Sequence, residues 1–212
     1  MRRKIFFYSD PHFNHANIIR YCNRPFKNVD QMNEALIKNY NFLVRDDDLV
    51  YFMGDLGLDK DLSVIIKQLK GKKILIKGNH DKLSNQAYYN MGFTAVLQYA
   101  KIKVGKNYFT LSHYPNRSLK SMIHICYLYF IKTLRTQKKI KYAWNRFKKE
   151  WNRYKESNDR SSHYRIHGHV HGRWKTMNRN INTSVDVWDF KPVSVNKIVE
   201  VINKGQYYEE RK

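Results

Sequence analysis

Five short apolar runs in the sequence are each followed at once by a stretch rich in Asp, Asn or His. The polar stretches read SDPHFNH (9–15), MGDLG (53–57), KGNHD (77–81), LSHYP (111–115) and HGHVHG (167–172). β-Branched and aromatic residues dominate the preceding runs, which predicts strands at 4–9, 49–53, 73–77, 108–112 and 162–167, with a sixth at 95–104. Ligands bind at the carboxyl ends of strands in open α/β sheets. We therefore expect residues from most of the chain to meet in one crevice.

Helical patterns lie between these strands. Met32, Ala35, Leu36, Tyr40 and Leu43 fall at helical spacing after Asp30, which we expect to be the N-cap. Residues 60–69 and 194–203 also have a helical pattern. Alternation of strands and helices predicts an α/β fold, and 212 residues suit a single domain spanning 1–212.

The chain is strongly basic, with a formal net charge of +22. Such a charge favours a polyanionic partner, namely a nucleotide, nucleic acid or an anionic membrane surface. A compositional bias toward Lys, Asn and Tyr with few acids would give the same charge without such a partner.

Two cysteines, Cys22 and Cys126, have no metal-type spacing, which predicts reduced, partly buried thiols and a cytoplasmic location. The apolar run at the N-terminus is too short for a signal peptide. The longest apolar stretch, near residues 122–131, is too short to cross a bilayer. The sequence therefore predicts no transmembrane segment, and it makes no prediction of oligomeric state.

Residues 117–160 contain no glycine or proline and are predicted to form a basic helical insertion. Two helical stripes run through it: Ile123, Tyr127, Phe130 and Leu134, then Ile140, Trp144, Phe147, Trp151 and Tyr154. One interpretation is an amphipathic hairpin packed on the domain with a solvated basic face. The other is an arm or lid that holds a polyanionic substrate or makes peripheral contact with a membrane.

The polar stretches together offer a mixed oxygen and nitrogen ligand set. Its members are Asp10, His12, Asp55, Asn79, His113, His169 and His171. Such a set suits Mn, Fe, Zn or Ni better than Mg or Ca alone, and Asp55 has two carboxylate oxygens to share between two ions. Two metals about 3.5–4 Å apart can hold a bridging hydroxide and clamp an in-line displacement at phosphorus. Regular strand alternation would put His169 and His171 on one face. For each histidine to bind a different metal, the backbone between them must turn. Gly168 and Gly172 make such a turn plausible.

The series D-x-H, G-D, G-N-H-D, H and G-H-x-H, from Ser9 to Gly172, resembles the calcineurin-like metallophosphoesterase superfamily. The resemblance implies a two-sheet β-sandwich flanked by helices. It implies that Asp10, His12 and His171 bind one metal, and that Asp55 bridges. Asn79, His113 and His169 would bind the second metal. His80 would protonate the leaving oxygen or stabilise charge, and Asp81 would orient or tune His80.

Two further stretches, SDPHFNHANIIRYCNRPF and NTSVDVWDFKPVS, resemble a group of small bacterial and phage phosphoesterases. The long basic segment between His113 and His167 departs from that group, whose members have a shorter connection. This departure leaves the size and access of the substrate open.

Other residues have two interpretations. His15 is an outer-shell or substrate-binding candidate, or a structural turn histidine. Arg24 is a candidate for gripping a phosphate through two N–H groups, or a surface arginine before a proline turn. His167 is expected to end a strand, and Trp188 and Phe190 are expected in the core.

The leading expectation is a dimetal phosphoesterase, more specifically a phosphodiesterase that acts on a nucleotide, a cyclic nucleotide or nucleic acid through a metal-bridging hydroxide. The alternatives are a nucleic-acid-binding module with a vestigial site, a phosphomonoesterase, and a lipid-headgroup phosphoesterase.

Overall fold

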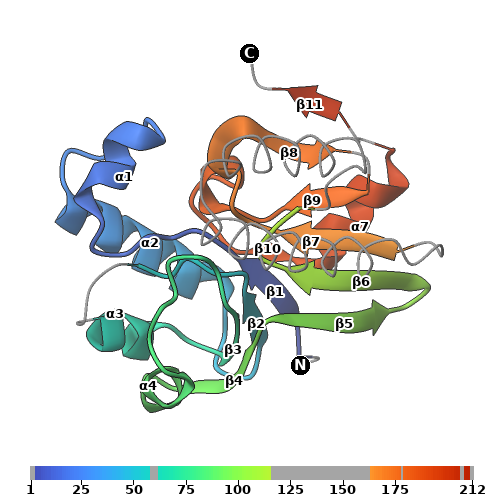
Figure 1. Cartoon of the computed structure of the whole chain (residues 1–212). Coiled ribbons are helices and arrows are strands. Elements are labelled where there is room, and N and C mark those ends of the chain that lie inside the picture. Colours follow the sequence, from blue (N-terminus) through green and yellow to red (C-terminus); the bar gives the residue numbers. More distant parts are fainter. Residues whose placement is uncertain (1–2, 58–61, 116–162, 178, 206–207, 211–212) are drawn as a thin grey trace, which may run out of the picture. The chain divides into compact units, whose positions relative to one another are not determined.

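The computed structural model contains two sheets with flanking helices (Figure 1), and it describes residues 3–57, 62–115, 163–177, 179–205 and 208–210. The basic insertion expected at 117–160 lies outside the described residues, as does Cys126. The expected fold class, a two-sheet α/β sandwich flanked by helices, is confirmed.

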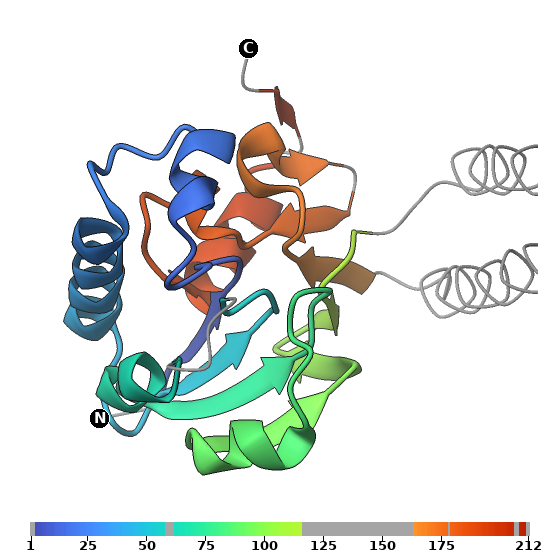
Figure 2. The ribbon, with the colours of Figure 1, turned by 60° about the vertical axis from the view of Figure 1, so that its left-hand side comes forward.

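The first sheet carries most of the strands predicted in the first half of the chain. Its order is β10 (Val193–Ser194), β1 (Ile5–Tyr8), β2 (Leu49–Phe52), β3 (Lys72–Ile76) and β4 (Phe93–Leu97). The strands from β1 to β4 are parallel and only β10 is antiparallel. Figure 2 shows the arrows of β1, β2 and β3 side by side and pointing the same way. Their carboxyl ends therefore share one edge of the sheet.

The second sheet collects strands from the middle and the end of the chain. Its order is β11 (Tyr208–Glu210), β8 (Trp174–Met177), β9 (Asn180–Asn182), β7 (His163–His167), β6 (Asn107–Ser112) and β5 (Tyr99–Val104). β5 and β6 form an antiparallel pair, whereas β7 and β9 are parallel.

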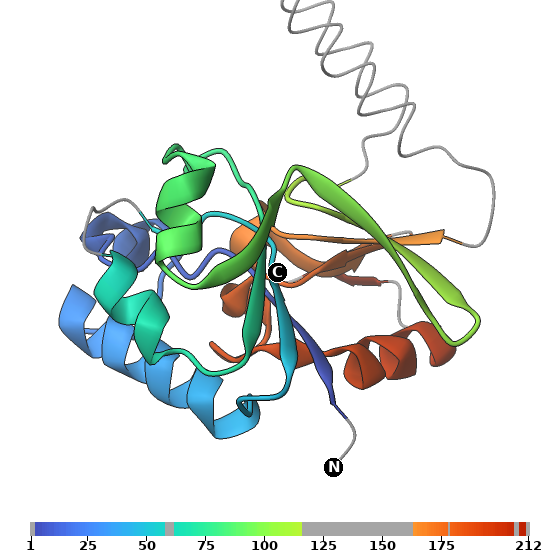
Figure 3. The same cartoon turned by 90° about the horizontal axis from the view of Figure 1, so that it is seen from below.

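Alternation along β1 divides the core into two clusters, because neighbouring side chains in a strand point to opposite faces. Tyr8 packs with the helix side of the first sheet, and Phe7 packs with residues of the second sheet such as Phe109. The helices on the Tyr8 side are α1 (Ala16–Tyr21), α2 (Val29–Leu43), α3 (Leu62–Gln68) and α4 (Asn85–Asn90). Figure 3 shows α2, α3 and α4 on one side of the first sheet and the second sheet on the other. Helix α7 (Val195–Asn203) adds its apolar face to the Phe7 cluster.

The segment 95–104 is not one strand, as predicted, but parts of two. β4 ends at Leu97 in the first sheet, and β5 begins at Tyr99 in the second. Both pieces are rich in β-forming residues, so local composition does not reveal the change of sheet at Gln98. The sequence did not predict the short elements α1, α4, β8, β9, β10 and β11.

Asp30 is not the N-cap of α2. The helix starts at Val29 after Asn28, whose extended backbone lets its side-chain oxygen accept the N–H of Gln31. The Gln31 side chain in turn accepts the N–H of Lys27 at 2.7 Å. Asp30 lies in the first turn, where a carboxylate interacts favourably with the helix dipole.

Among the described residues, no helix combines the length and the apolar character that crossing a bilayer requires. Trp188 and Phe190 pack in or against the core, as predicted. The Trp188 indole N–H donates to the Asn182 carbonyl at 2.7 Å.

We expect Asn28→Ala to lower the free energy of unfolding by about 1 kcal/mol, because it leaves helix N–H groups without an acceptor. Asp30→Ala, the matched control in the same turn, should cost only about 0.3 kcal/mol through the helix dipole. Urea denaturation followed by circular dichroism measures both. Equal costs, or a larger one for Asp30, would contradict the cap assignment.

Candidate metal centre

The candidate ligands follow strand ends in both sheets. Asp10 and His12 follow β1, Asp55 follows β2 and Asn79 follows β3. From the second sheet, His113 follows β6, and His169 and His171 follow β7. Backbone hydrogen bonds tie the loops together: Asp10 N–H donates to the Gly54 carbonyl at 3.0 Å, and Gly168 N–H donates to the His113 carbonyl at 3.1 Å.

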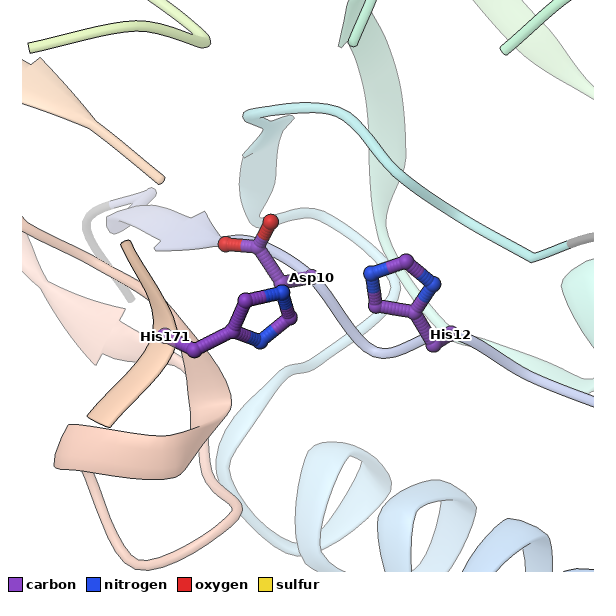
Figure 4. A group of neighbouring side chains, drawn as sticks. All are labelled: Asp10, His12 and His171. Carbon is purple, nitrogen blue, oxygen red and sulfur yellow. The ribbon is translucent and has the colours of Figure 1, made fainter. Parts of the chain in front are cut away.

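Six of these side chains form two groups. Asp10, His12 and His171 offer ligand atoms within 4.8 Å of one another, and so do Asp55, His113 and His169. Figure 4 shows the first group, whose members come from the loop after β1 and from the short 3-10 helix η1 (His171–Arg173). The two histidines of the H-x-H stretch therefore belong to different groups.

The backbone of these loops is left-handed at the ligand positions. φ is +54° at Asp10, +51° at His12, +57° at Asp55, +70° at His169 and +49° at His171. Non-glycine residues adopt this conformation at a cost, and such residues cluster at functional sites. The left-handed turns at His169 and His171 interrupt strand alternation, which lets the two imidazoles point to different groups.

Two glycines are required by the close approach of these loops. A Cβ at Gly168 would collide with Ser9 Oγ and Asp10 Oδ2, and a Cβ at Gly78 would collide with Asp55 Oδ1. The backbone after β7 thus lies directly against the Asp10 carboxylate. The same contact lets His169 N–H donate to the two Asp10 carboxylate oxygens, each at 3.1 Å.

Asp55 belongs to the second group and also faces His12 of the first. Its Oδ2 is 3.4 Å from His113 Nε2 and 3.8 Å from His12 Nε2. Its Oδ1 accepts the His80 backbone N–H at 2.9 Å. Burial alone would raise the pKa of Asp55, but the hydrogen bond and charge of His113 and the His80 N–H bring it well below its usual range. Asp55 is therefore an ionised carboxylate that faces both groups.

Two histidines are oriented through their Nδ1 atoms. His113 Nδ1–H donates to the Met53 carbonyl at 2.8 Å, and His171 Nδ1–H donates to Asp186 Oδ2 at 2.8 Å. Burial alone would lower the pKa of His171, but the bond to Asp186 and nearby negative charge raise it to about 10. His113 Nε2 then faces Asp55, and it lies 3.0 Å from Asn79 Oδ1.

His12 supplies a direct test of whether a cation fits. Its Nε2 atom is buried and has no hydrogen-bond partner, which is costly for a polar atom. Burial lowers the pKa of His12 to about 3, so its ring is neutral and carries a lone pair. A neutral buried imidazole with an unpartnered nitrogen, beside the Asp55 carboxylate, fits a divalent cation.

Asp81 does not orient the His80 ring, contrary to expectation. Its Oδ2 accepts the N–H groups of Asp55 at 2.8 Å and Gly78 at 2.7 Å, and its Oδ1 accepts that of Leu56 at 3.1 Å. Asp81 thus joins the loops after β2 and β3. The His80 side chain is 39% exposed, and its Nε2 lies 4.0 Å from Asp55 Oδ2.

Arg24 is not placed to bind a phosphate. It is 4% exposed. Its Nε and Nη2 donate to Asp186 at 2.8 and 3.0 Å, and Nη2 also donates to the Asp10 carbonyl at 2.8 Å. Nη1 donates to the Pro11 carbonyl at 2.8 Å and contacts Met32 Sδ at 3.4 Å. All five N–H groups are used inside the protein, so the expected role in substrate binding is corrected.

His15 lies beside a ligand and not in the centre itself. Its Nδ1 is 3.4 Å from His12 Nδ1, which corresponds to the outer-shell alternative. His167 ends β7 as expected, fully buried, with its Nδ1–H donating to the Gly168 carbonyl at 2.7 Å.

Sequence reasoning missed Asp186 and the proximity of Cys22. Asp186 lies in the short 3-10 helix η2 (Val185–Val187), and no metal-type spacing marks it. Cys22 is a half-buried free thiol whose Sγ lies within 4.8 Å of ligand atoms of His171 and Asp186. Only the three-dimensional contacts bring these residues to His171.

Comparison with known proteins agrees with this geometry. A family model of calcineurin-like phosphoesterases matches residues 3–198, and the chain belongs to this family. It is 36% identical over 215 residues to the uncharacterized protein MJ1445 of Methanocaldococcus jannaschii, covering 96% of this chain and 94% of the relative. A solved structure of AQ665 from Aquifex aeolicus, a protein of unknown function, is 26% identical with a TM-score of 0.63. That similarity covers 94% of this chain and 100% of AQ665. Membership of the family implies phosphoester hydrolysis.

We expect Asp81→Asn to destabilise the protein by about 1.5–3 kcal/mol, because an amide cannot accept all three backbone N–H groups. Since Asp81 holds the Asp55 backbone, affinity for Mn²⁺ should fall as well. Thermal unfolding and calorimetric Mn²⁺ titration measure the two effects. Asp189→Asn, an exposed control, should change neither, and an Asp81→Asn variant as stable as the control would contradict the assigned role.

Proposed function

We propose that the chain is a two-metal phosphodiesterase that hydrolyses a nucleotide, a cyclic nucleotide or nucleic acid. The observation that carries the proposal is the position of Asp55 Oδ2, within 4 Å of both His12 and His113. One carboxylate oxygen thus lies between two groups of ligand atoms, as a bridge between two cations requires.

Seven side chains would hold the two ions. Asp10, His12 and His171 would hold the first ion, Asn79, His113 and His169 the second, and Asp55 both. The mixture of imidazole, carboxylate and amide ligands favours Mn, with Fe, Zn or Ni as alternatives. Two divalent ions, when bound, supply positive charge for the phosphate oxygens and a nucleophilic hydroxide at neutral pH.

His80 is the candidate general acid. Its side chain is 39% exposed, and its ring centroid lies 5.4 Å from that of His12. Its backbone N–H is bonded to Asp55 Oδ1, which fixes the loop beside the bridging carboxylate. A histidine in this position can donate a proton to the leaving oxygen of a phosphoester.

The preference for a polyanionic substrate rests on charge. A net charge of +22 attracts phosphodiester chains as well as small nucleotides. A vestigial site in a nucleic-acid-binding module is the weaker proposal, because the expected ligands are present and their side chains are gathered at one centre. A nucleic-acid partner and a cytoplasmic location belong to the same proposal.

The test is metal-dependent hydrolysis on a panel of phosphoesters. The panel contains bis-p-nitrophenyl phosphate, p-nitrophenyl phosphate, 2′,3′- and 3′,5′-cyclic nucleotides, and short single-stranded DNA and RNA, each with Mn²⁺. We expect diesters to be cut faster than the monoester. His80→Ala should lower kcat by about 10²–10⁴-fold, because it removes a general acid.

Asp55→Asn should abolish activity and weaken Mn²⁺ binding, whereas Asp47→Asn, at an exposed position, should leave both unchanged. If Mn, Ni, Fe and Zn all fail to support hydrolysis while DNA or RNA binds with steep salt dependence, the enzyme proposal is wrong. The binding module would then replace it.

A further inference from the structure

The carboxylate of Asp186 is fully engaged inside the protein. Its Oδ1 accepts Arg24 Nε–H at 2.8 Å. Its Oδ2 accepts Arg24 Nη2–H at 3.0 Å, His171 Nδ1–H at 2.8 Å and the Ser184 hydroxyl at 3.1 Å. The Asp186 side chain is 4% exposed and that of Arg24 is completely buried. Burial of an ion pair is costly unless its hydrogen bonds are satisfied, and here each partner has them.

The guanidinium of Arg24 also holds the loop that carries the first group. It donates to the Asp10 carbonyl and to the Pro11 carbonyl, both at 2.8 Å. A single side chain therefore links the backbone of Asp10 to the carboxylate that orients His171. Asp10 and His171 lie far apart in the sequence, and they follow strands of different sheets.

The bond from Asp186 decides which nitrogen of His171 is available to a metal. Because Nδ1–H is donated to a carboxylate, Nε2 is the nitrogen left to coordinate. A carboxylate behind a metal-binding histidine fixes the ring and makes it a stronger ligand.

In the second group, the acceptor that orients His113 is uncharged. His113 is oriented by the neutral carbonyl of Met53, and Asn79 is an exposed side chain. The two groups thus differ in the charge behind one histidine of each, since His171 donates to a carboxylate and His113 to a neutral carbonyl.

We infer that Asp186 and Arg24 are positioning residues that preorganise the first group, so that it binds its divalent cation more tightly than the second group does. The inference rests on the metal centre of the proposed function, and it adds an order of filling. The first site fills first and the second site fills at higher metal concentration.

The test is calorimetric titration of the metal-free, full-length chain with Mn²⁺. The wild-type chain should bind two ions in two separable steps. Asp186→Asn keeps the side-chain volume but removes the charge behind His171. It should weaken the tighter step by about 10–100-fold, the usual effect of losing a partner of a metal ligand, and change the weaker step by less than about threefold.

Arg24→Lys keeps the charge but cannot reproduce the two-pronged contact, so it should weaken the same step. Asp48→Asn is the matched control, because Asp48 is also a buried carboxylate, bonded to the N–H groups of Lys4 and Arg45. It should lower the melting temperature without changing either binding step.

The outcomes separate the two proposals. Two ions bound by the wild type with unchanged affinities in Asp186→Asn would overturn the positioning role and leave the proposed function standing. Equal weakening of both steps, or the same result in Asp48→Asn, would reduce Asp186 to a structural residue. Fewer than two ions bound by the wild type would overturn the two-metal proposal itself, and the order of filling with it.

Discussion

The left-handed backbone at five candidate ligands is the constraint on which the centre depends. Each such residue costs about 1–3 kcal/mol, so other contacts must hold the loops in place. Asp81 supplies three acceptor contacts to the loops after β2 and β3, and the Asp10 carboxylate accepts the N–H of His169. Glycines at 78 and 168 permit the close approach. The Asp10 and Asp81 carboxylates therefore stabilise the backbone of these loops, and Asp10 is a candidate ligand as well.

Charge is distributed very unevenly in this basic chain. Asp10, Asp55, Asp81 and the Asp186 side chain are all buried around the centre. Arg24 is the buried arginine among them, and its guanidinium lies against Asp186. An excess of carboxylate over buried cation leaves a local deficit of positive charge, although the chain as a whole carries +22. The divalent ions of the proposed function would neutralise that excess of negative charge.

The sequence predicted the residues of the centre better than their contacts. Short polar stretches after apolar strands predicted that Asp10, Asp55 and Asn79 lie near one another, because the parallel strands β1, β2 and β3 end at one edge of the first sheet. Arg24 was a candidate for binding a substrate phosphate, whereas it donates to Asp186 and to two backbone carbonyls. Asp81 was expected to orient or tune His80, whereas it accepts three backbone N–H groups. Which atoms a buried charge contacts depends on loops far away in the sequence, and no local pattern records that. The change of sheet at Gln98 was missed for a related reason, since both halves have the composition of strands.

The candidate ligands follow strands of both sheets. Asp10, His12, Asp55 and Asn79 follow strands of the first sheet, and His113, His169 and His171 follow strands of the second. A cation shared by such ligands is a cross-link between the sheets, because it bonds to both only when they are packed together. Its binding energy then adds to the cohesion of the fold by mass action. The fraction of molecules with a loaded centre and the free energy of unfolding would then both depend on the free concentration of divalent metal around the protein.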